Sequence, residues 1–210
     1  MNPADLVVRG LRPEDLPEAG RLRHTFFVEK KGWVRGPDRE ELDAYDARAL
    51  HFGAFHEGRL VGYMRALRGA EPGGMMLDHD FREALTDAEY ARIVRPGSVE
   101  LSRRVVAPDL SVRQAKEVAG LLFQLFYVAC VEERFENLYL VQQPSYGPML
   151  RRFYGLALRP LNAVPYTFAD GTVVNVDHAS IADLLRGIEQ RGLRPVYDAF
   201  LARHGAALGG

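Results

Sequence analysis

The stretch VELSRRVVAP, residues 99–108, decides how the rest of this sequence is interpreted, because it combines the composition of a buried strand with charges in its middle. Valine and leucine are typical of strands. Strand alternation places Glu100 and Ser102 on one face of a sheet and Leu101 and Arg103 on the other. A bulge would change that alternation and leave backbone N–H groups to point at a ligand. Because an unpaired charge inside a sheet destabilises the fold, we expect Glu100 and Arg103 to have partners and a function.

Candidate partners for these charges come earlier in the chain. Arg65 lies in the second strand of a predicted hairpin, where it could meet Glu100 across the sheet. Asp43 and Asp46 are three residues apart in EELDAYD and could face one pocket, and Arg23 lies on the first predicted helix. We expect these groups to converge into one polar cavity. The alternative is that they form ion pairs on the surface.

Helix and strand signals alternate along the chain, and this order predicts an α/β (α+β) fold with a mixed sheet flanked by helices on both faces. The length of 210 residues favours a single domain, residues 1–210. Periodicity, caps and turn residues define the elements. The expected strands are 5–9, the quoted stretch and 137–142, with hairpins at 51–67 and 165–177; the expected helices are 12–32, 77–85, 86–94, 112–134 and 146–155, followed by two closing helices at Ser180 and Pro195.

Composition excludes several classes of protein. The formal net charge of −1 gives no basic excess for nucleic acid. The single cysteine, Cys130, lies in an apolar helix pattern, so no disulfide forms within the chain, which fits a reducing cytoplasm. No signal peptide is visible, and no apolar run reaches the ~20 residues of a membrane span. The six histidines lack metal-ligand spacing, so we expect a cytoplasmic protein without a metal.

An ordered set of motifs resembles the acyl-homoserine-lactone synthases, which are autoinducer synthases with a fold like that of the Gcn5-related N-acetyltransferases (GNAT). The family pattern is an arginine, a phenylalanine and a tryptophan, then E-x-D-x-x-D, G-x-x-R, M-L-x-x-x-F and E-L-S-R. This sequence fills the slots in order with Arg23, Phe27, Trp33, EELDAYD (40–46), GYMR (62–65), MLDHDF (76–81) and ELSR (100–103). The match covers about half of the chain, residues 20–104.

The resemblance implies an N-acyltransferase of quorum sensing whose sheet is splayed to admit an acyl-pantetheine arm. Such an enzyme moves a fatty acyl group from acyl-carrier protein or acyl-CoA to the amino group of S-adenosylmethionine. The product closes to an acyl-homoserine lactone and methylthioadenosine leaves. These substrates, and no permanently bound cofactor, are therefore what the resemblance implies for this chain.

The resemblance also assigns roles to residues. Glu100 and Arg103 are the implied catalytic residues, and Arg65 and Glu100 would form an ion pair behind the acceptor. The implied acceptor-binding residues are Arg23, Phe27, Trp33, Asp43, Asp46, Arg65 and Phe81, and the implied acyl-carrier or pantetheine contacts are Val105, Val106 and Arg113.

Elementary chemistry agrees with these roles. An α-ammonium group must lose a proton before it attacks a thioester, and Glu100 is the first candidate for the base. Backbone N–H groups at a bulge could bind the developing oxyanion. A sulfonium cation favours nearby carboxylates and an aromatic face such as Trp33. The start of the long helix, at Ser111, could receive a phosphate with help from Arg113.

Three alternatives remain open. The run DARALHFGAF (46–55), and the absence of the Pro-Thr that usually follows G-x-x-R, resemble N-acyl amino acid synthases of the same fold, which use a free amino acid as acceptor. A non-catalytic binding module and an acetyltransferase acting on proteins or antibiotics are the others. Ser102 is not favoured as a nucleophile, because no histidine is placed to activate it. The aromatic run Phe123, Phe126 and Tyr127 is expected to be core rather than an acyl tunnel.

Overall fold

The computed structural model describes residues 5–34, 39–70, 73–161, 165–168 and 171–204. The chain divides into two compact units. The first unit comprises Met1–Arg65, Arg103–Ala129 and Ala199–Gly210, and the second comprises Ala66–Ser102 and Cys130–Asp198. We describe each unit by itself, and the prediction of a single domain stays a prediction.

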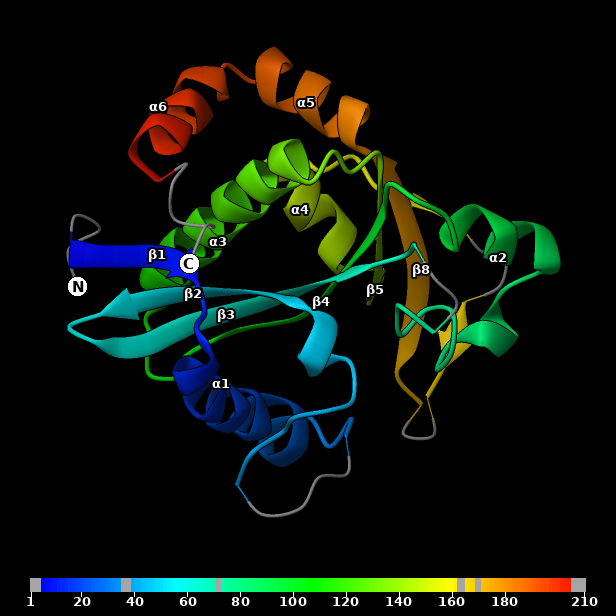
Figure 1. Cartoon of the computed structure of the whole chain (residues 1–210), viewed down its shortest axis with the longest axis horizontal. Helices are drawn as coiled ribbons and strands as arrows, with labels where there is room; N and C mark the ends of the chain where they lie inside the picture. Colours follow the sequence, from blue (N-terminus) through cyan, green and yellow to red (C-terminus); the bar gives the residue numbers. More distant parts are fainter. Residues whose placement is uncertain (1–4, 35–38, 71–72, 162–164, 169–170, 205–210) are drawn as a thin grey trace. The chain divides into compact units, whose positions relative to one another are not determined.

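Eight strands, six α-helices and four shorter helical segments make up the described chain (Figure 1). The strands are β1 (Leu6–Gly10), β2 (Leu50–His56), β3 (Arg59–Arg68), β4 (Ser98–Val106), β5 (Asn137–Gln142), β6 (Arg159–Pro160), β7 (Tyr166–Thr167) and β8 (Val173–Ser180). The α-helices are α1 (Leu16–Arg23), α2 (Asp87–Ile93), α3 (Val112–Glu132), α4 (Tyr146–Tyr154), α5 (Ile181–Gln190) and α6 (Arg194–His204). The shorter segments are the 3-10 turns η2 (Pro13–Asp15), η4 (Asp46–Arg48) and η5 (Arg82–Ala84) and the π-helix η3 (His24–Lys30).

The strands form a mixed sheet, as the sequence predicts. Their hydrogen-bonded order is β1-β2-β3-β4-β5-β8-β6, and β7 pairs with β8. β1 and β2 are antiparallel, β4 and β5 are parallel, and β5 and β8 are antiparallel. The ladder between β4 and β5 joins Ser98–Glu100 to Asn137–Tyr139. β3 and β4 each contribute residues to both units.

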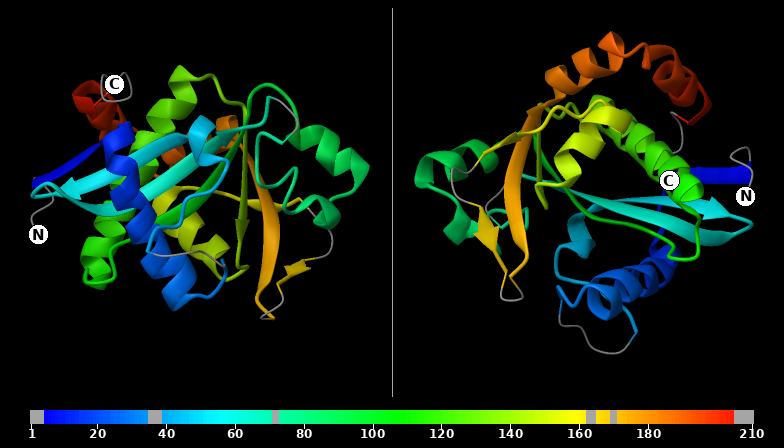
Figure 2. Two further views of the ribbon diagram at one scale, coloured as in Figure 1. Left: turned by 60° about the horizontal axis from the view of Figure 1, so that its bottom comes forward. Right: turned by 180° about the vertical axis from the view of Figure 1, so that it is seen from behind.

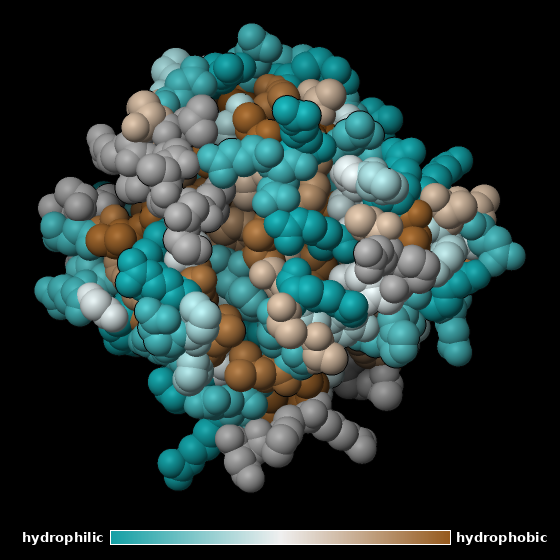
Figure 3. All heavy atoms as spheres, viewed as in Figure 1, coloured by the Kyte–Doolittle hydropathy of each residue, from teal (hydrophilic) through white to brown (hydrophobic). Residues whose placement is uncertain are grey.

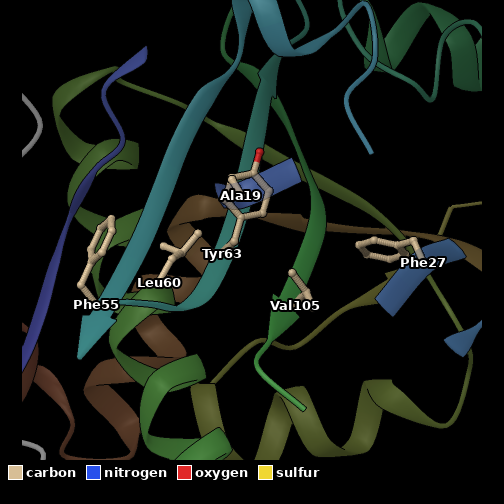
Figure 4. Packing of buried hydrophobic residues seen from close by; sticks show 6 residues of the cluster. All are labelled: Ala19, Phe27, Phe55, Leu60, Tyr63 and Val105. Atoms are coloured by element: carbon tan, nitrogen blue, oxygen red, sulfur yellow. The ribbon is translucent and has the colours of Figure 1, made fainter. Parts of the chain in front are cut away.

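The first unit has helices on both faces of its strands. Gly62 of β3 faces α3, because a Cβ atom there would lie 2.3 Å from Val118 Cγ1, so a larger residue would force the strand and helix apart. Tyr63, the next residue, points to the other face and packs with Ala19 of α1. Figures 1 and 2 show α1 and α3 on opposite sides of β2 and β3. Figure 4 shows the core on the α1 side, which contains Ala19, Phe27, Phe55, Leu60, Tyr63 and Val105.

The second unit is built around the long antiparallel pair of β5 and β8. Leu140 lies opposite Asp177, and Gln142 lies opposite Asn175. β8 leads directly into α5, and the Ser180 hydroxyl accepts a hydrogen bond from Asp183 N at 3.0 Å, which confirms the predicted cap. The end of α4 touches α5, since a Cβ atom on Gly187 would lie 2.6 Å from Gly155 O.

Local sequence signals predict most element boundaries correctly. The first hairpin turns at Glu57 and Gly58, both with positive φ, which is the two-residue turn that matches strand twist. The predicted capping boxes form at Thr86 with Glu89 and at Ser111 with Gln114. In the second hairpin Tyr166–Thr167 pairs with β8 and Gly171 has a φ of +83°, while Asp170 lies outside the described residues.

Two expected helices differ from the prediction. Residues 77–85 form turns followed by the 3-10 segment η5 rather than an α-helix. Three successive N–H groups, from His79 to Phe81, bond to the single oxygen of Met76, and the bonds that follow, such as Ala84 N to Phe81 O, are of the i to i−3 type. The expected helix 12–32 passes from 3-10 through α to π geometry before Gly32 ends it with a φ of +63°.

The surface and interior of the described chain agree with the composition. Figure 3 shows hydrophilic residues covering most of one face, with small hydrophobic areas between them. Cys130 is buried, and burial raises the pKa of its thiol, as expected for a core residue. The predicted core residues Phe123, Phe126 and Tyr127 are buried as well. Within the residues that the structure covers, no helix is long and apolar enough to cross a membrane.

Candidate active site

The predicted irregularity in β4 is present at Arg103. Its φ of +51° is a left-handed conformation, which is uncommon for a residue with a Cβ and costs energy in the middle of a strand. The side chain is held by the first unit: Arg103 Nη2 lies 3.0 Å from Glu41 Oε1 and 3.3 Å from Asp43 Oδ2. The guanidinium carbon lies 5.4 Å from the centre of the Phe27 ring. A strained backbone fixed in this way is typical of functional sites.

Two other arginines complete the same group of charges. Arg23 Nε donates to Glu41 Oε2 at 2.5 Å, and Arg23 Nη1 donates to Asp46 Oδ1 at 2.7 Å. Arg65 Nη1 donates to Asp43 Oδ1 at 2.6 Å and to Asp46 Oδ1 at 2.7 Å. We call this group the ion-pair cluster, and its members are Arg23, Glu41, Asp43, Asp46, Arg65 and Arg103.

The backbone fixes the acidic half of the cluster. Glu41 N donates to Gly20 O at 2.9 Å, which ties this segment to α1. Asp43 N donates to Asp46 Oδ2 at 2.7 Å, and Tyr45 N donates to Asp43 Oδ1 at 3.0 Å. The two aspartates of E-x-D-x-x-D therefore close a turn with these backbone N–H groups. Asp46 uses Oδ2 for the turn and Oδ1 for the arginines, whereas Asp43 Oδ1 accepts from both Tyr45 N and Arg65. This arrangement brings Asp43 and Asp46 together, as the sequence predicts.

The end of the first helix places the aromatic residues. In the π-helix η3, Lys31 N donates to Phe26 O at 3.1 Å, the i to i−5 pattern of that helix. Trp33 N then donates to Phe27 O at 3.0 Å, which folds Trp33 back so that the two ring centres lie 6.3 Å apart. Lys31 Nζ lies 5.0 Å from the centre of the Trp33 ring. Phe27 and Trp33 thus adjoin the cluster, and this aromatic face already receives a cation.

Three cations and three anions balance in the cluster, and this balance sets its electrostatics. Burial opposes the charge on Arg23, but the hydrogen bond from it to Glu41 and the nearby acids raise its pKa above the ordinary value. Burial also opposes the charges of Asp46 and Arg65. The two arginines nevertheless lower the pKa of Asp46, and Asp43 raises the pKa of Arg65. All three groups therefore stay charged near neutral pH.

Exposure divides the cluster into residues that can and cannot reach a ligand. The side chains of Arg23 and Arg65 are 0 % exposed, whereas Asp43 is 22 % and Arg103 13 % exposed. Asp43 and Arg103 can therefore contact an acceptor directly. In this conformation Arg23 and Arg65 hold the acids in place, and Arg23 Nη2 lies 3.5 Å from Asp43 Oδ2 with no hydrogen bond to a described residue.

Three residues of this site received no role from the sequence. Glu41 bridges Arg23 and Arg103, and its only signal was its place in the first slot of E-x-D-x-x-D. Tyr63 accepts a hydrogen bond from Arg23, and His51 is bonded to Tyr63. His51 lies in the run DARALHFGAF, which resembles N-acyl amino acid synthases, but the sequence suggested no role for His51 itself.

Glu100 and Phe81 belong to the second unit. Glu100 is buried in β4, and its Oε2 atom accepts a hydrogen bond from Leu77 N at 3.0 Å. Phe81 packs edge to face against Tyr166 and Phe168, with ring centres 5.4 and 5.9 Å away. The predicted ion pair between Arg65 and Glu100 would join the two units and stays a prediction.

The expected pantetheine contacts are spread over the first unit. Val105 is buried in the core of Figure 4, and Val106 is half-buried at the end of β4. Arg113 is exposed on the first turn of α3 and pairs with Glu117 at 3.1 Å. The side chain of Val105 is committed to the core, so a ligand contact there would use its backbone. The roles of all three residues stay predictions.

A cavity of about 450 Å³ lies in the second unit, away from the residues that the sequence singled out. Its lining includes Gln142, Asn175 and Asp177 from β5 and β8 and the side chains of Arg151 and Arg191. Gln142 Nε2 donates to Asp177 Oδ2 at 2.6 Å. Burial raises the pKa of Asp177, and the hydrogen bond from Gln142 partly opposes that shift.

The raised pKa of Asp177 predicts that Asp177→Asn stabilises the protein at high pH. A group whose pKa is higher in the folded state favours folding at acid pH, and this contribution is lost as the pH rises through the folded pKa. Asparagine keeps an acceptor for Gln142 without the charge. We expect the Tm at pH 8 to rise by roughly 2–4 °C, the shift that about 1 kcal/mol gives at this size, and to be unchanged near pH 4.

Asp183→Asn is the matched control for this prediction. Asp183 is half-buried, and the Ser180 hydrogen bond and nearby arginines lower its pKa, so its substitution should change Tm in the opposite direction at pH 8. Thermal denaturation of both variants at the two pH values measures the difference. A lower Tm for Asp177→Asn at pH 8 would contradict the prediction.

Residues 22–121, which include the whole ion-pair cluster, match the family described as acetyltransferase (GNAT) domain. The matched stretch is a little under half of the chain, and it is similar to a GNAT domain. The fold of the chain is that of acyl-homoserine-lactone synthases, as the sequence resemblance implied. No curated protein sequence matches the chain.

Several solved structures share the GNAT fold of this chain. A CoA-dependent acyl-homoserine lactone synthase, BjaI, with SAM and isopentyl-CoA has a TM-score of 0.70 at 22 % identity, covering 90 % of both chains. The AHL synthase LasI has a TM-score of 0.69 at 22 % identity, covering 84 % of this chain and 89 % of that one. FeeM, an N-acyl amino acid synthase from uncultured soil microbes, has a TM-score of 0.63 at 17 % identity, covering 85 % and 92 %. At these identities the likeness establishes the fold.

Proposed function

We propose that this protein is an N-acyltransferase that moves a fatty acyl group from a thioester carrier, acyl-CoA or acyl-carrier protein, to the amino group of S-adenosylmethionine. The observation that carries the proposal is the ion-pair cluster beside the strained residue Arg103. A neutral, buried set of three arginines and three acids contributes little net stability compared with apolar packing, so a function explains its presence better. We further propose that residues 1–210 act as one domain in the cytoplasm.

The partly exposed members of the cluster, Asp43 and Arg103, suit a zwitterionic acceptor. Asp43 can attract an ammonium or sulfonium cation, and Arg103 can bind a carboxylate through its guanidinium group. Phe27 and Trp33 give an apolar wall beside them. Arg23, Asp46 and Arg65 hold Asp43 and Arg103 in this arrangement. Phe81 is proposed to line the substrate cavity.

The proposed reaction has two steps. Glu100 takes a proton from the acceptor ammonium group, and the free amine attacks the thioester carbonyl carbon, so that an N–C bond forms and the carrier thiolate leaves. Backbone N–H groups at the irregular part of β4, from Arg103 to Val105 and Val106, bind the oxyanion. The carboxylate oxygen of the acyl product then displaces the sulfonium sulfur, which closes the lactone and releases methylthioadenosine. Arg113 would bind a phosphate of the carrier.

A free amino acid is the alternative acceptor. Two observations favour it: the likeness to FeeM, and the position of Lys31 Nζ 5.0 Å from the Trp33 ring centre, where a sulfonium cation would otherwise lie. An amino acid has no second cation and needs no free aromatic face. The first step is the same for both acceptors, and only lactone closure distinguishes them.

One experiment separates these acceptors and tests the proposal. The full chain is incubated with acetyl-, hexanoyl- or dodecanoyl-CoA, or the matching acyl-carrier proteins, and with either S-adenosylmethionine or a mixture of amino acids. Mass spectrometry then detects acyl-homoserine lactone with methylthioadenosine, or an N-acyl amino acid. The proposal would be rejected if the long-chain donors gave no product with either acceptor, or if acetyl-CoA were the only donor that gave product. The Asp46→Asn variant is the negative control.

A further inference from the structure

A chain of hydrogen bonds connects Arg23 to Asp46 by a second route, through two side chains to which the sequence assigned no role. Arg23 Nη1 donates to Tyr63 Oη at 3.4 Å, and Tyr63 Oη lies 2.8 Å from His51 Nδ1. His51 Nε2 lies 2.8 Å from the backbone oxygen of Asp46. Since Arg23 Nη1 also donates to the Asp46 carboxylate at 2.7 Å, the four residues form a closed loop in the first unit.

Hydrogen-bond accounting assigns every proton in this loop. A backbone oxygen can only accept, so His51 Nε2 must carry a hydrogen. A neutral imidazole has one N–H, and therefore Nδ1 accepts and the Tyr63 hydroxyl donates to it. The Tyr63 oxygen is then free to accept from Arg23. With neutral His51, each donor in the loop meets an acceptor.

We propose that His51 and Tyr63 are positioning residues of the acceptor site, and that they hold Arg23 and Asp46 in place only while His51 is neutral with its hydrogen on Nε2. This proposal rests on the proposed function, because only that function defines an acceptor site. In this proposal His51 does not contact a ligand. It positions the backbone of Asp46 directly and Arg23 through Tyr63. Asp46 in turn fixes the more exposed Asp43 through the turn between them.

A second proton on His51 would break the loop. Nδ1–H would then donate to the Tyr63 oxygen, which reverses this hydrogen bond, and the buried hydroxyl hydrogen would lose its acceptor. The charged groups that face His51 are Arg23 from α1, Arg65 from β3 and the Asp46 carboxylate from η4, with the Tyr63 hydroxyl beside them. Burial lowers the pKa of His51, opposed by Asp46 and supported by the two arginines.

The direction of the pKa shift gives a sign for pH dependence. A histidine whose pKa is lower in the folded state favours folding above its ordinary pKa of about 6.5, and this contribution is lost as the pH falls through the folded pKa. Acceptor binding should follow the same direction. We therefore expect the KM for the acceptor to rise as the pH falls through the folded pKa of His51, which lies below the ordinary value of about 6.5, while the KM for the acyl donor changes little.

Two single variants test the loop kinetically. Tyr63→Phe removes the hydroxyl and leaves a buried arginine N–H and a ring nitrogen without their partner, so the acceptor KM should rise about tenfold with the donor KM within about twofold. His51→Gln removes the titrating group and should flatten the acid limb of the acceptor kcat/KM profile. The matched control is His178→Gln, because His178 is a half-buried histidine of the second unit, bonded to Asn137, whose pKa is also lowered by burial. The His178→Gln variant should have the wild-type KM for the acceptor and the wild-type acid limb in its kcat/KM profile.

Nitrogen-15 NMR of the histidine side chains in the full-length protein tests the loop without turnover. At pH 7.5 we expect a neutral His51 with the hydrogen on Nε2, assigned by its loss in His51→Gln. A hydrogen on Nδ1 or a charged ring would overturn the proposal, and so would an unchanged acceptor KM in Tyr63→Phe with only a lower Tm. If wild-type protein acylates no acceptor, the proposed function fails, and the acceptor-site role fails with it; the NMR result then still decides whether the loop exists.

Discussion

Replacing Asp46 with asparagine should lower the free energy of unfolding by about 3–5 kcal/mol, the cost of leaving buried charges unpaired. Asp46 Oδ1 accepts from both Arg23 and Arg65 at 2.7 Å, and neither arginine has exposed surface. Asparagine cannot neutralise two guanidinium groups that have no access to water. Urea denaturation at pH 7.5 measures the change, and the same variant should form no detectable N-acyl product.

The control for Asp46 is Asp109→Asn. Asp109 also pairs with an arginine, Arg59, at 2.8 Å, but both side chains are more than half exposed. Water can solvate Arg59 when its partner is lost, so the Tm should change little. Equal losses in the two variants would contradict the view that burial sets the cost.

The Asp46 pair also sets acid stability. The two arginines lower the pKa of Asp46 below its ordinary value even though burial acts in the opposite direction. A carboxylate whose pKa is lower in the folded state stabilises the fold above the unfolded pKa of about 3.9, and this stability is lost as the pH falls through the folded pKa. Asp46→Asn should therefore remove part of the acid dependence of unfolding below about pH 4.

Replacing Glu100 with glutamine should lower acyl transfer by about 10²–10⁴-fold, the usual contribution of a general base. The Tm should stay within a few degrees, because the amide oxygen of glutamine can still accept the hydrogen bond from Leu77 N. Arg103→Ala should also abolish product formation, since it removes a proposed acceptor contact. The rate of thiol release from acyl-CoA in the presence of acceptor measures both effects.

Glu133→Gln is the control for Glu100, because Glu133 pairs with Arg68 in an exposed ion pair of the same unit. It should keep wild-type turnover. Full activity in Glu100→Gln would remove Glu100 from the role of base, and a collapse of Tm in that variant would show that its charge is structural.

The sequence predicted the sheet, most element boundaries and the members of the charged site, because these depend on local patterns. Alternation marked β4 as a strand whose charges needed partners, and the positive φ of Arg103 confirms the predicted irregularity. The convergence of Arg23, Asp43, Asp46 and Arg103 is likewise confirmed. Arg103 stood out because charge is unusual in an apolar strand, whereas Asp43 and Asp46 stood out by their spacing in EELDAYD.

The exact pairing could not be predicted, since it depends on contacts between distant segments. Nothing local indicates that Glu41 bridges Arg23 and Arg103. Tyr63 and His51 are ordinary residues of a hairpin until folding brings Arg23 and Asp46 beside them. The change from α to π geometry at His24 alters hydrogen-bond partners without a clear signature in composition.

The π-helical segment has a consequence for how much variation in chain length this part of the protein can tolerate. Residues 24–30 wind more loosely than an α-helix, so the segment holds a surplus of chain relative to its length. If one residue between Arg23 and Phe27 were lost, these side chains would be three residues apart instead of four, which would turn one relative to the other by about 100°. Either Arg23 or Phe27 would then leave the neighbourhood of Arg103. The four-residue interval between Arg23 and Phe27 must therefore stay constant, because an insertion or deletion within it would separate these two side chains at the site.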